Sequence, residues 1–90
     1  MAVSYDIDFH IPVKEVSRAR YYKLETEDSL TVEQLLALLA ERFSAMQSLM
    51  RYRTGKKLPV AVLVNGHILE HDEVVPDGAV VKIIGTVAGG

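Results

Sequence analysis

The stretch TVEQLLALLAERFSAM, residues 31–46, is the most clearly specified element of the chain. Thr31 and Gln34 have the spacing of a capping box, in which each side chain accepts a hydrogen bond from a free backbone amide of the first helical turn. Apolar residues then recur at helical spacing, at Leu35, Leu38, Leu39, Phe43 and Met46. The pattern predicts one amphipathic helix that starts at the Thr31 cap, ends near Ser48 and packs one face on a core.

Two strands are expected before this helix. From Val3 to Ile11 every second residue is apolar, which is typical of a half-buried strand. The segment Val16–Glu25 contains Val16, Tyr21, Tyr22 and Leu24. We expect it to form a second strand that pairs with the first as a hairpin.

The segment after the helix predicts three more strands. Leu58–Val64 is continuously apolar with β-branched valines, as in a central strand that is covered on both faces. Asn65-Gly66 is a tight-turn signal that leads into a short extended segment at His67–Glu70. A second turn at Pro76–Gly78 precedes the last predicted strand, Ala79–Ile84.

The length and composition of the chain exclude several classes of protein. The chain has 90 residues, of which 49% are hydrophobic and 24% charged, so we expect one α+β domain over residues 1–90 with a tail at 85–90. Its net charge of −2 disfavours nucleic acid as a partner, and its apolar stretches are too short to span a membrane. With no cysteine, it has neither a thiol nucleophile nor a thiolate metal site. No targeting segment is recognisable, so we expect a cytoplasmic protein with protein partners.

The sequence ends in Val87-Ala88-Gly89-Gly90, directly after an apolar segment. Glycine has no Cβ, so a Gly-Gly end can pass through a narrow channel and bring its carboxylate close to another protein's main chain. We expect a flexible tail that is delivered to a partner. Small residues at a loose chain terminus are the alternative interpretation.

The order of elements, the stretch Val62–Gly66, the Pro76–Gly78 turn and the Val87–Gly90 ending resemble the MoaD and ThiS family of sulfur carriers. This resemblance covers the whole chain and implies a ubiquitin-like, two-layer β-grasp fold, with a mixed sheet packed on one main helix. A MoaD-type ending usually has a Pro-Pro-Val step, whereas this chain has Ile84-Gly85-Thr86-Val87, so its tail is expected to be less stiff.

The resemblance also implies a chemistry for the last two glycines. In the family, an ATP-dependent adenylyltransferase of the ubiquitin-activating type, similar to MoeB or ThiF, adenylates the last glycine, and a persulfide sulfur displaces AMP. Gly90 would carry the resulting thiocarboxylate, and Gly89 would keep its approach open. The chain would then be a co-substrate rather than a free-standing enzyme, with no cofactor of its own. It would serve as the small subunit of molybdopterin synthase beside a larger, MoaE-like subunit, or it would serve another acceptor in thiazole, cysteine or transfer-RNA sulfur chemistry.

Docking requires a surface as well as a tail. If alternate valines of residues 60–64 face the helix, Ala61 and Leu63 point to the opposite face, and we expect Val81 and Ile83 or their neighbours to join them there. An exposed apolar patch of this kind marks a protein interface, unless long side chains of neighbouring strands cover it. Val87 and Ala88 are expected at the mouth of the partner's channel, and Val87 has the alternative role of closing the last strand.

Two other functions remain open at this stage. The same activated glycine, attacked by a lysine amine, would make the chain a ubiquitin-like protein modifier. A β-grasp binding module with an incidental Gly-Gly ending is the third possibility. His67, His71 and Asp72 cluster loosely, but their segment is predicted to be extended and turn, so we expect solvated histidines and no metal site.

Overall fold

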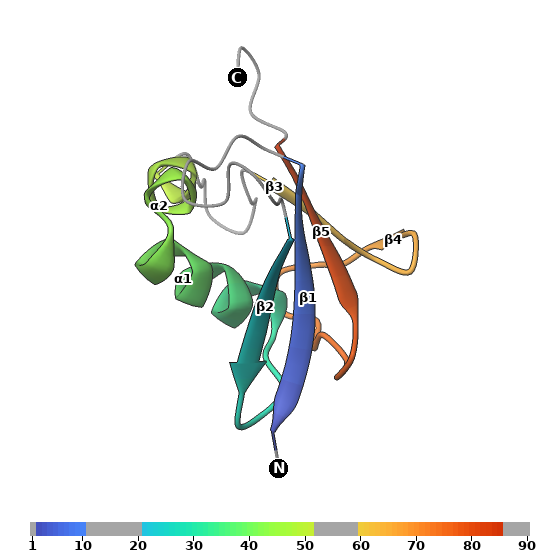
Figure 1. Cartoon of the computed structure of the whole chain (residues 1–90). Coiled ribbons are helices and arrows are strands. Elements are labelled where there is room, and N and C mark those ends of the chain that lie inside the picture. The colour runs from blue at the N-terminus through green and yellow to red at the C-terminus, as the bar shows by residue number, and fades with distance from the viewer. Residues whose placement is uncertain (1, 11–20, 52–59, 86–90) are drawn as a thin grey trace.

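A five-stranded mixed sheet and two helices make up the part of the chain that the computed structural model describes, residues 2–10, 21–51 and 60–85. The elements, in chain order, are β1 (Val3–His10), β2 (Tyr21–Thr26), α1 (Val32–Arg42), α2 (Ser44–Met50), β3 (Val60–Val64), β4 (His67–Ile68) and β5 (Val80–Gly85). Both helices lie on the same side of the sheet (Figure 1).

The strands lie in the order β2-β1-β5-β3-β4. The first and last strands, β1 and β5, are neighbours and run parallel, whereas β1 with β2, β5 with β3, and β3 with β4 are antiparallel. This is the predicted α+β architecture of two layers, a β-grasp fold with a mixed sheet packed on one main helix. The expected hairpin of the first two strands is confirmed.

The hydrophobic core lies between the sheet and the helices. Because successive strand residues point to opposite faces, Tyr5, Ile7 and Phe9 of β1 all enter the core. Of the predicted apolar stripe, Leu35, Leu39, Phe43 and Met46 are buried and Leu38 is half-buried. Val32 and Leu36 of α1 are also buried. Burial of this apolar surface is the main favourable contribution to folding.

Hydrogen bonds from the capping box and from the β4–β5 connection stabilise the first turn of α1. The predicted capping box is present, with the Gln34 amide donating to Thr31 Oγ1 over 3.2 Å and the Thr31 amide donating to Gln34 Oε1 over 2.9 Å. The amides of Val32 and Glu33 donate instead to backbone carbonyls of the β4–β5 connection, those of Glu73 and His71, each over 2.9 Å. The connection therefore supplies acceptors that the helix cannot supply for itself.

The prediction of one continuous helix to Ser48 is wrong, because the helix breaks at Phe43. Phe43 is extended, with φ −126° and ψ 121°, and its amide still donates to the Leu39 carbonyl over 2.8 Å. The ring of Phe43 makes edge-to-face contacts with the rings of Phe9 and Tyr22, at centroid distances of 5.3 and 4.9 Å. Neither described helix is long enough to cross a bilayer, which takes about 20 residues.

Both predicted turns are confirmed, and one strand boundary shifts. Asn65 and Gly66 have φ of 53° and 80°, as a tight hairpin turn requires, and Gly78 of the second turn has φ of 82°. Gly85 belongs to β5 and pairs with Val60, so the prediction that the tail begins at Gly85 is wrong. The remaining tail, residues 86–90, lies outside the described residues, as do 11–20 and 52–59.

The Tyr5 side chain joins three segments that are distant in the sequence. Its hydroxyl donates to the carbonyl of Val75 over 2.8 Å and accepts from the amide of Leu30 over 3.0 Å. The side chain is fully buried, so water does not replace either bond. One phenol therefore ties β1 to the segment before α1 and to the β4–β5 connection.

We expect Tyr5→Phe to lower the free energy of unfolding by about 1–3 kcal/mol, because the Val75 carbonyl and the Leu30 amide lose a buried partner. Urea unfolding followed by circular dichroism measures the loss. Tyr22→Phe is the matched control, since it removes only an exposed bond from Arg42. An equal loss in the two variants would contradict the bridging role of Tyr5.

Gly66→Ala is expected to destabilise the chain by about 1–2 kcal/mol through the backbone alone. The glycine is in the left-handed region, and a Cβ built on it has no heavy atom within 4 Å, so steric overlap with the rest of the fold adds nothing. Gly66→Asn is expected to cost less, because asparagine tolerates this region. Thermal unfolding compares the two variants, and equal losses would show that the turn geometry does not set the cost.

Candidate functional site

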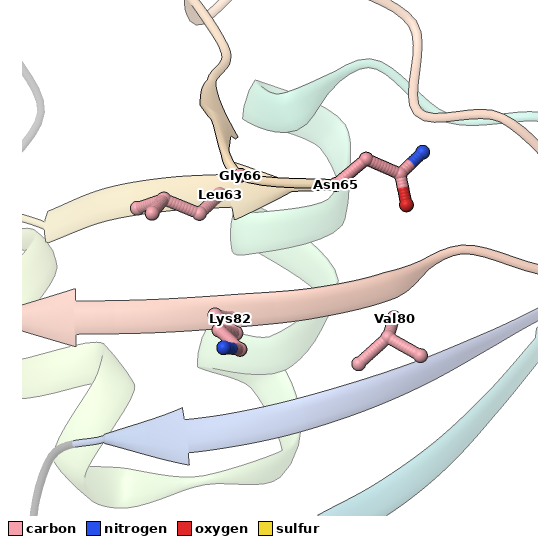
Figure 2. Close-up of a pocket in the computed structure, with 5 residues that line it drawn as sticks. All are labelled: Leu63, Asn65, Gly66, Val80 and Lys82. Atoms are coloured by element: carbon pink, nitrogen blue, oxygen red, sulfur yellow. The ribbon is translucent and has the colours of Figure 1, made fainter.

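The face of the sheet that points away from the helices is the first candidate surface, here called the open face. In Figure 2 the sheet lies in front of the helix, and the side chains of Leu63, Val80 and Lys82 are on the viewer's side of it. The described helices cover only the other face (Figure 1). The open face is therefore the broad surface of this sheet that the described elements leave available.

Ala61 and Leu63 lie on the open face, as predicted, and both are half-buried. Of the two alternatives expected for the last strand, Val81 and Ile83 are wrong, since both are 0% exposed in the core, and their neighbours are confirmed on the open face. The pairing of β3 with β5 gives the reason. Val81 pairs with Val64 and Ile83 with Val62, and directly paired residues share a face, here the face that packs on the helices.

Three other residues of β5 take their place on the open face, namely Val80, Lys82 and Ile84. Ile84 pairs with Ala61, and Lys82 pairs with Leu63. Ile68 of β4 pairs with Leu63 from the other side and is 69% exposed, one of the most exposed apolar side chains described. The sequence of residues 79–84 predicts that alternate residues share a face, but it does not say whether the odd-numbered or the even-numbered residues face away from the helices. The register with β3 decides that the even-numbered residues do.

The tail residues Val87, Ala88, Gly89 and Gly90 lie outside the described residues. The described chain stops at Gly85, at the end of β5, where the parallel register places Ile84 beside His10 of β1. The last residues of β5 and of β1 are thus neighbours at one end of the sheet. A segment that follows Gly85 starts from this end, at the border of the open face.

A histidine and a carboxylate of β1 are in contact near the same end of the sheet. His10 Nε2 lies 3.0 Å from Asp8 Oδ2, and Asp8 is 2% exposed although its strand position faces away from the helices. When the imidazole is protonated, the contact is an ion pair beside the start of the tail segment. The pair holds His10 in place on the open face.

The two histidines that follow β3 have different surroundings. His67 is exposed on β4, whereas His71 Nδ1 lies 3.4 Å from Glu33 Oε2 and links the β4–β5 connection to α1. The expectation that His71 is a solvated histidine is therefore wrong. Within residues 2–10, 21–51 and 60–85, no group of three or more metal-ligating side chains comes together.

Three solved structures illustrate the likeness of the fold to known proteins. The HVO 2177 protein of Haloferax volcanii superposes with a TM-score of 0.76 at 23% identity, covering 99% of this chain and 88% of its own. A Pyrococcus furiosus protein described as molybdopterin converting factor, subunit 1, has a TM-score of 0.73 at 20% identity, covering 94% and 99%. SAMP1 of Haloferax volcanii has a TM-score of 0.64 at 23% identity, covering 97% and 99%. At these identities the likeness establishes the fold alone.

A comparison with curated protein sequences gave no match. A family model, in contrast, matches residues 13–90, from before β2 to the final glycine. The match spans most of the chain and includes four of the five strands, both helices and the Gly-Gly ending. The resemblance noted in the sequence is thereby confirmed, and the chain belongs to the ThiS family.

Proposed function

We propose that this chain is a sulfur carrier that acts through the carboxylate of Gly90, as the small subunit of a synthase of the molybdopterin type. The observation that carries the proposal is the family match, which continues to residue 90 and so includes both glycines of the ending. The fold shared with the protein described as molybdopterin converting factor, subunit 1, supports the choice of synthase.

The proposed chemistry needs activation first, because a carboxylate is a poor electrophile. Attack of a Gly90 carboxylate oxygen on the α-phosphorus of ATP gives an acyl-adenylate and releases pyrophosphate. A persulfide sulfur on a partner then displaces AMP at the carbonyl carbon and gives an acyl disulfide. A second thiol of the partner attacks the donor sulfur, so that a disulfide forms on the partner and the electron pair of the broken S–S bond leaves with the thiocarboxylate. The chain thus carries sulfur on its main chain, which suits a protein without cysteine.

The partners supply the acid, the base and the oxyanion donors in this proposal. An adenylyltransferase of the ubiquitin-activating type carries out the first step, and a larger MoaE-like subunit or another sulfur acceptor receives the sulfur in the cytoplasm. Gly89 keeps the main chain narrow beside the reacting carbon, with Val87 and Ala88 at the mouth of the partner's channel. The chain itself is a co-substrate.

The open face is the proposed docking surface for both partners. It adjoins the end of the sheet from which the tail segment starts, so a partner that holds Gly90 also approaches Ala61, Leu63 and Ile84. Half-buried apolar side chains on an uncovered sheet face are typical of the centre of a protein interface. Because both partners need the same tail, they bind one after the other.

Incubation with soluble host extract, ATP and a sulfur source is expected to raise the intact mass by one oxygen-to-sulfur exchange, and only in a chain that retains Gly90. Intact-mass spectrometry of the full-length chain and of a variant lacking Gly90 measures this. No exchange under conditions that convert a known carrier would overturn the proposal. High-molecular-weight conjugates that disappear with Gly90 would identify a protein modifier instead.

Leu63→Asp is expected to slow thiocarboxylate formation about tenfold or more, because it places a charge in the centre of the docking surface while leaving the core intact. The initial rate of the mass exchange measures the effect. Ala37→Asp, on the exposed side of α1, is the matched control and is expected to keep the wild-type rate. A folded Leu63→Asp chain that reacts at the wild-type rate would exclude the open face as the docking surface.

A further inference from the structure

The strand β2 forms one edge of the sheet. It pairs with β1 on one side, and no described residue pairs with its other side (Figure 1). Lys23 and Glu25 of this strand are exposed, so the edge is open to solvent. The opposite edge, β4, has only two residues, which is too short to pair with much of another strand. Natural proteins either protect an open edge strand or use it to bind another strand.

The hydrogen bonds of β1 show which backbone groups of β2 point outward. Both backbone groups of Ser4 form hydrogen bonds of 2.8 Å with the turn before β5, and the Asp6 amide donates to the Ala79 carbonyl over 3.0 Å. Ser4 and Asp6 therefore use the β5 side of β1. In an antiparallel pair, hydrogen-bonded and non-hydrogen-bonded positions alternate, so their partners Glu25 and Lys23 direct their own amides and carbonyls away from β1.

A second copy of the chain supplies a strand with the same pattern. A two-fold axis makes the two copies of β2 antiparallel. Hydrogen bonds form only where an outward-directed residue faces another, which excludes every register that pairs an odd-numbered residue with an even-numbered one. Two of the remaining registers keep most of the strand paired. One is centred on Lys23 and covers residues 21–25, and the other is centred on Leu24 and covers residues 22–26.

The charges on the strand distinguish these two registers. The register centred on Lys23 places the two lysines directly opposite each other. The register centred on Leu24 places Lys23 of each copy opposite Glu25 of the other, in two symmetric hydrogen-bonded pairs. Unlike charges directly opposite stabilise a strand pair, whereas like charges destabilise it. The register centred on Leu24 is therefore favoured.

The charges within one chain are compatible with this arrangement. Asp6 lies opposite Lys23, so the lysine already has a carboxylate across the strand pair. Glu25 lies opposite the neutral Ser4, and no described residue forms an ion pair with it. In the register centred on Leu24, each Lys23 lies between Asp6 of its own copy and Glu25 of the other copy. Glu25 thus acquires a cation, and Lys23 keeps the carboxylate that it has.

We propose that a second copy of this chain docks at the free edge of β2 and continues the sheet through the register centred on Leu24. This inference goes beyond the proposed function, because it concerns a different surface. β1 separates β2 from β5, so the dimer leaves Ala61, Leu63 and Ile84 of the open face uncovered. Each copy in the dimer keeps its own docking surface for a partner.

Sedimentation velocity and NMR of the full-length, ¹⁵N-labelled chain test the proposal between about 10 μM and about 1 mM, because one strand pair is a small interface and is expected to bind weakly. The dimer fraction is expected to rise over this range. Amide hydrogen exchange is then expected to slow at Lys23 and Glu25, whose amides point outward, and to change less at Leu24, whose amide bonds to β1 in both states. A chain that stays monomeric, or a dimer without protection at Lys23 and Glu25, would overturn the inference.

Glu25→Lys is expected to weaken dimerisation about tenfold or more, because it turns two attractive charge pairs into two repulsive ones. Glu70→Lys is the matched control, since it makes the same charge change at an exposed residue that follows β4, at the opposite edge of the sheet. It is expected to keep the wild-type dimer. Equal dimerisation of the two variants, each shown to be folded by circular dichroism, would contradict the proposed register.

A mixture of two variants tests the charge pairing directly. Lys23→Glu is expected to dimerise weakly by itself, as is Glu25→Lys, but the two chains together are expected to form a heterodimer in which every pair joins a lysine to a glutamate. A mixture of folded chains that stays monomeric would overturn the pairing. Because Lys23→Glu places a second carboxylate opposite Asp6, its fold is checked first, and the comparison of Glu25→Lys with Glu70→Lys decides if it does not fold.

The mass-exchange assay separates this inference from the proposed function. Folded, monomeric Glu25→Lys is expected to form the thiocarboxylate at the wild-type rate, because β2 is not part of the docking surface. A wild-type chain that forms the thiocarboxylate but no dimer would overturn the edge pairing alone. A chain that dimerises through β2 but forms no thiocarboxylate would support the edge pairing and exclude the sulfur carrier.

Discussion

The fold depends on the buried hydroxyl of Tyr5. It donates to Val75 and accepts from Leu30, so it satisfies two backbone groups that are separated by 70 and 25 residues from the tyrosine itself. Around this point the Val75 amide donates to the Leu30 carbonyl over 2.8 Å, and Thr31 forms a bridge with Val74. Buried polar groups without a partner are costly, so the three segments stabilise one another only when they are assembled together.

This assembly also aligns β5. The β4–β5 connection, which contacts the helix cap, continues through the turn at Gly78, whose amide donates to the Ser4 carbonyl over 2.8 Å. The amide of Asp6 donates to the Ala79 carbonyl over 3.0 Å. The parallel pairing of β1 with β5 follows from these contacts. Because a shift of one residue would exchange the two faces of β5, the contacts also decide which side chains reach the open face.

The two faces of the sheet serve different purposes as a result. The face toward the helices is closed by interlocking apolar side chains, and even the irregular extended residue Phe43 contributes its ring there. The open face keeps exposed aliphatic groups, among them Val80 and Ile68. An exposed apolar surface of this kind is typical of a protein interface, which agrees with the proposed docking of partner proteins.

Local sequence was sufficient for the helix cap, the apolar stripe, the two glycine turns, the strand order along the chain and the family, because each depends on residues close together or on a motif. It was also sufficient to place Ala61 and Leu63 opposite the helix. The break at Phe43, the histidine contact with Glu33 and the membership of Val80 and Lys82 in the open face were decided by tertiary structure alone. Each depends on which distant strand or helix lies alongside, and alternation within one strand gives the spacing of its two faces but not which of them is buried.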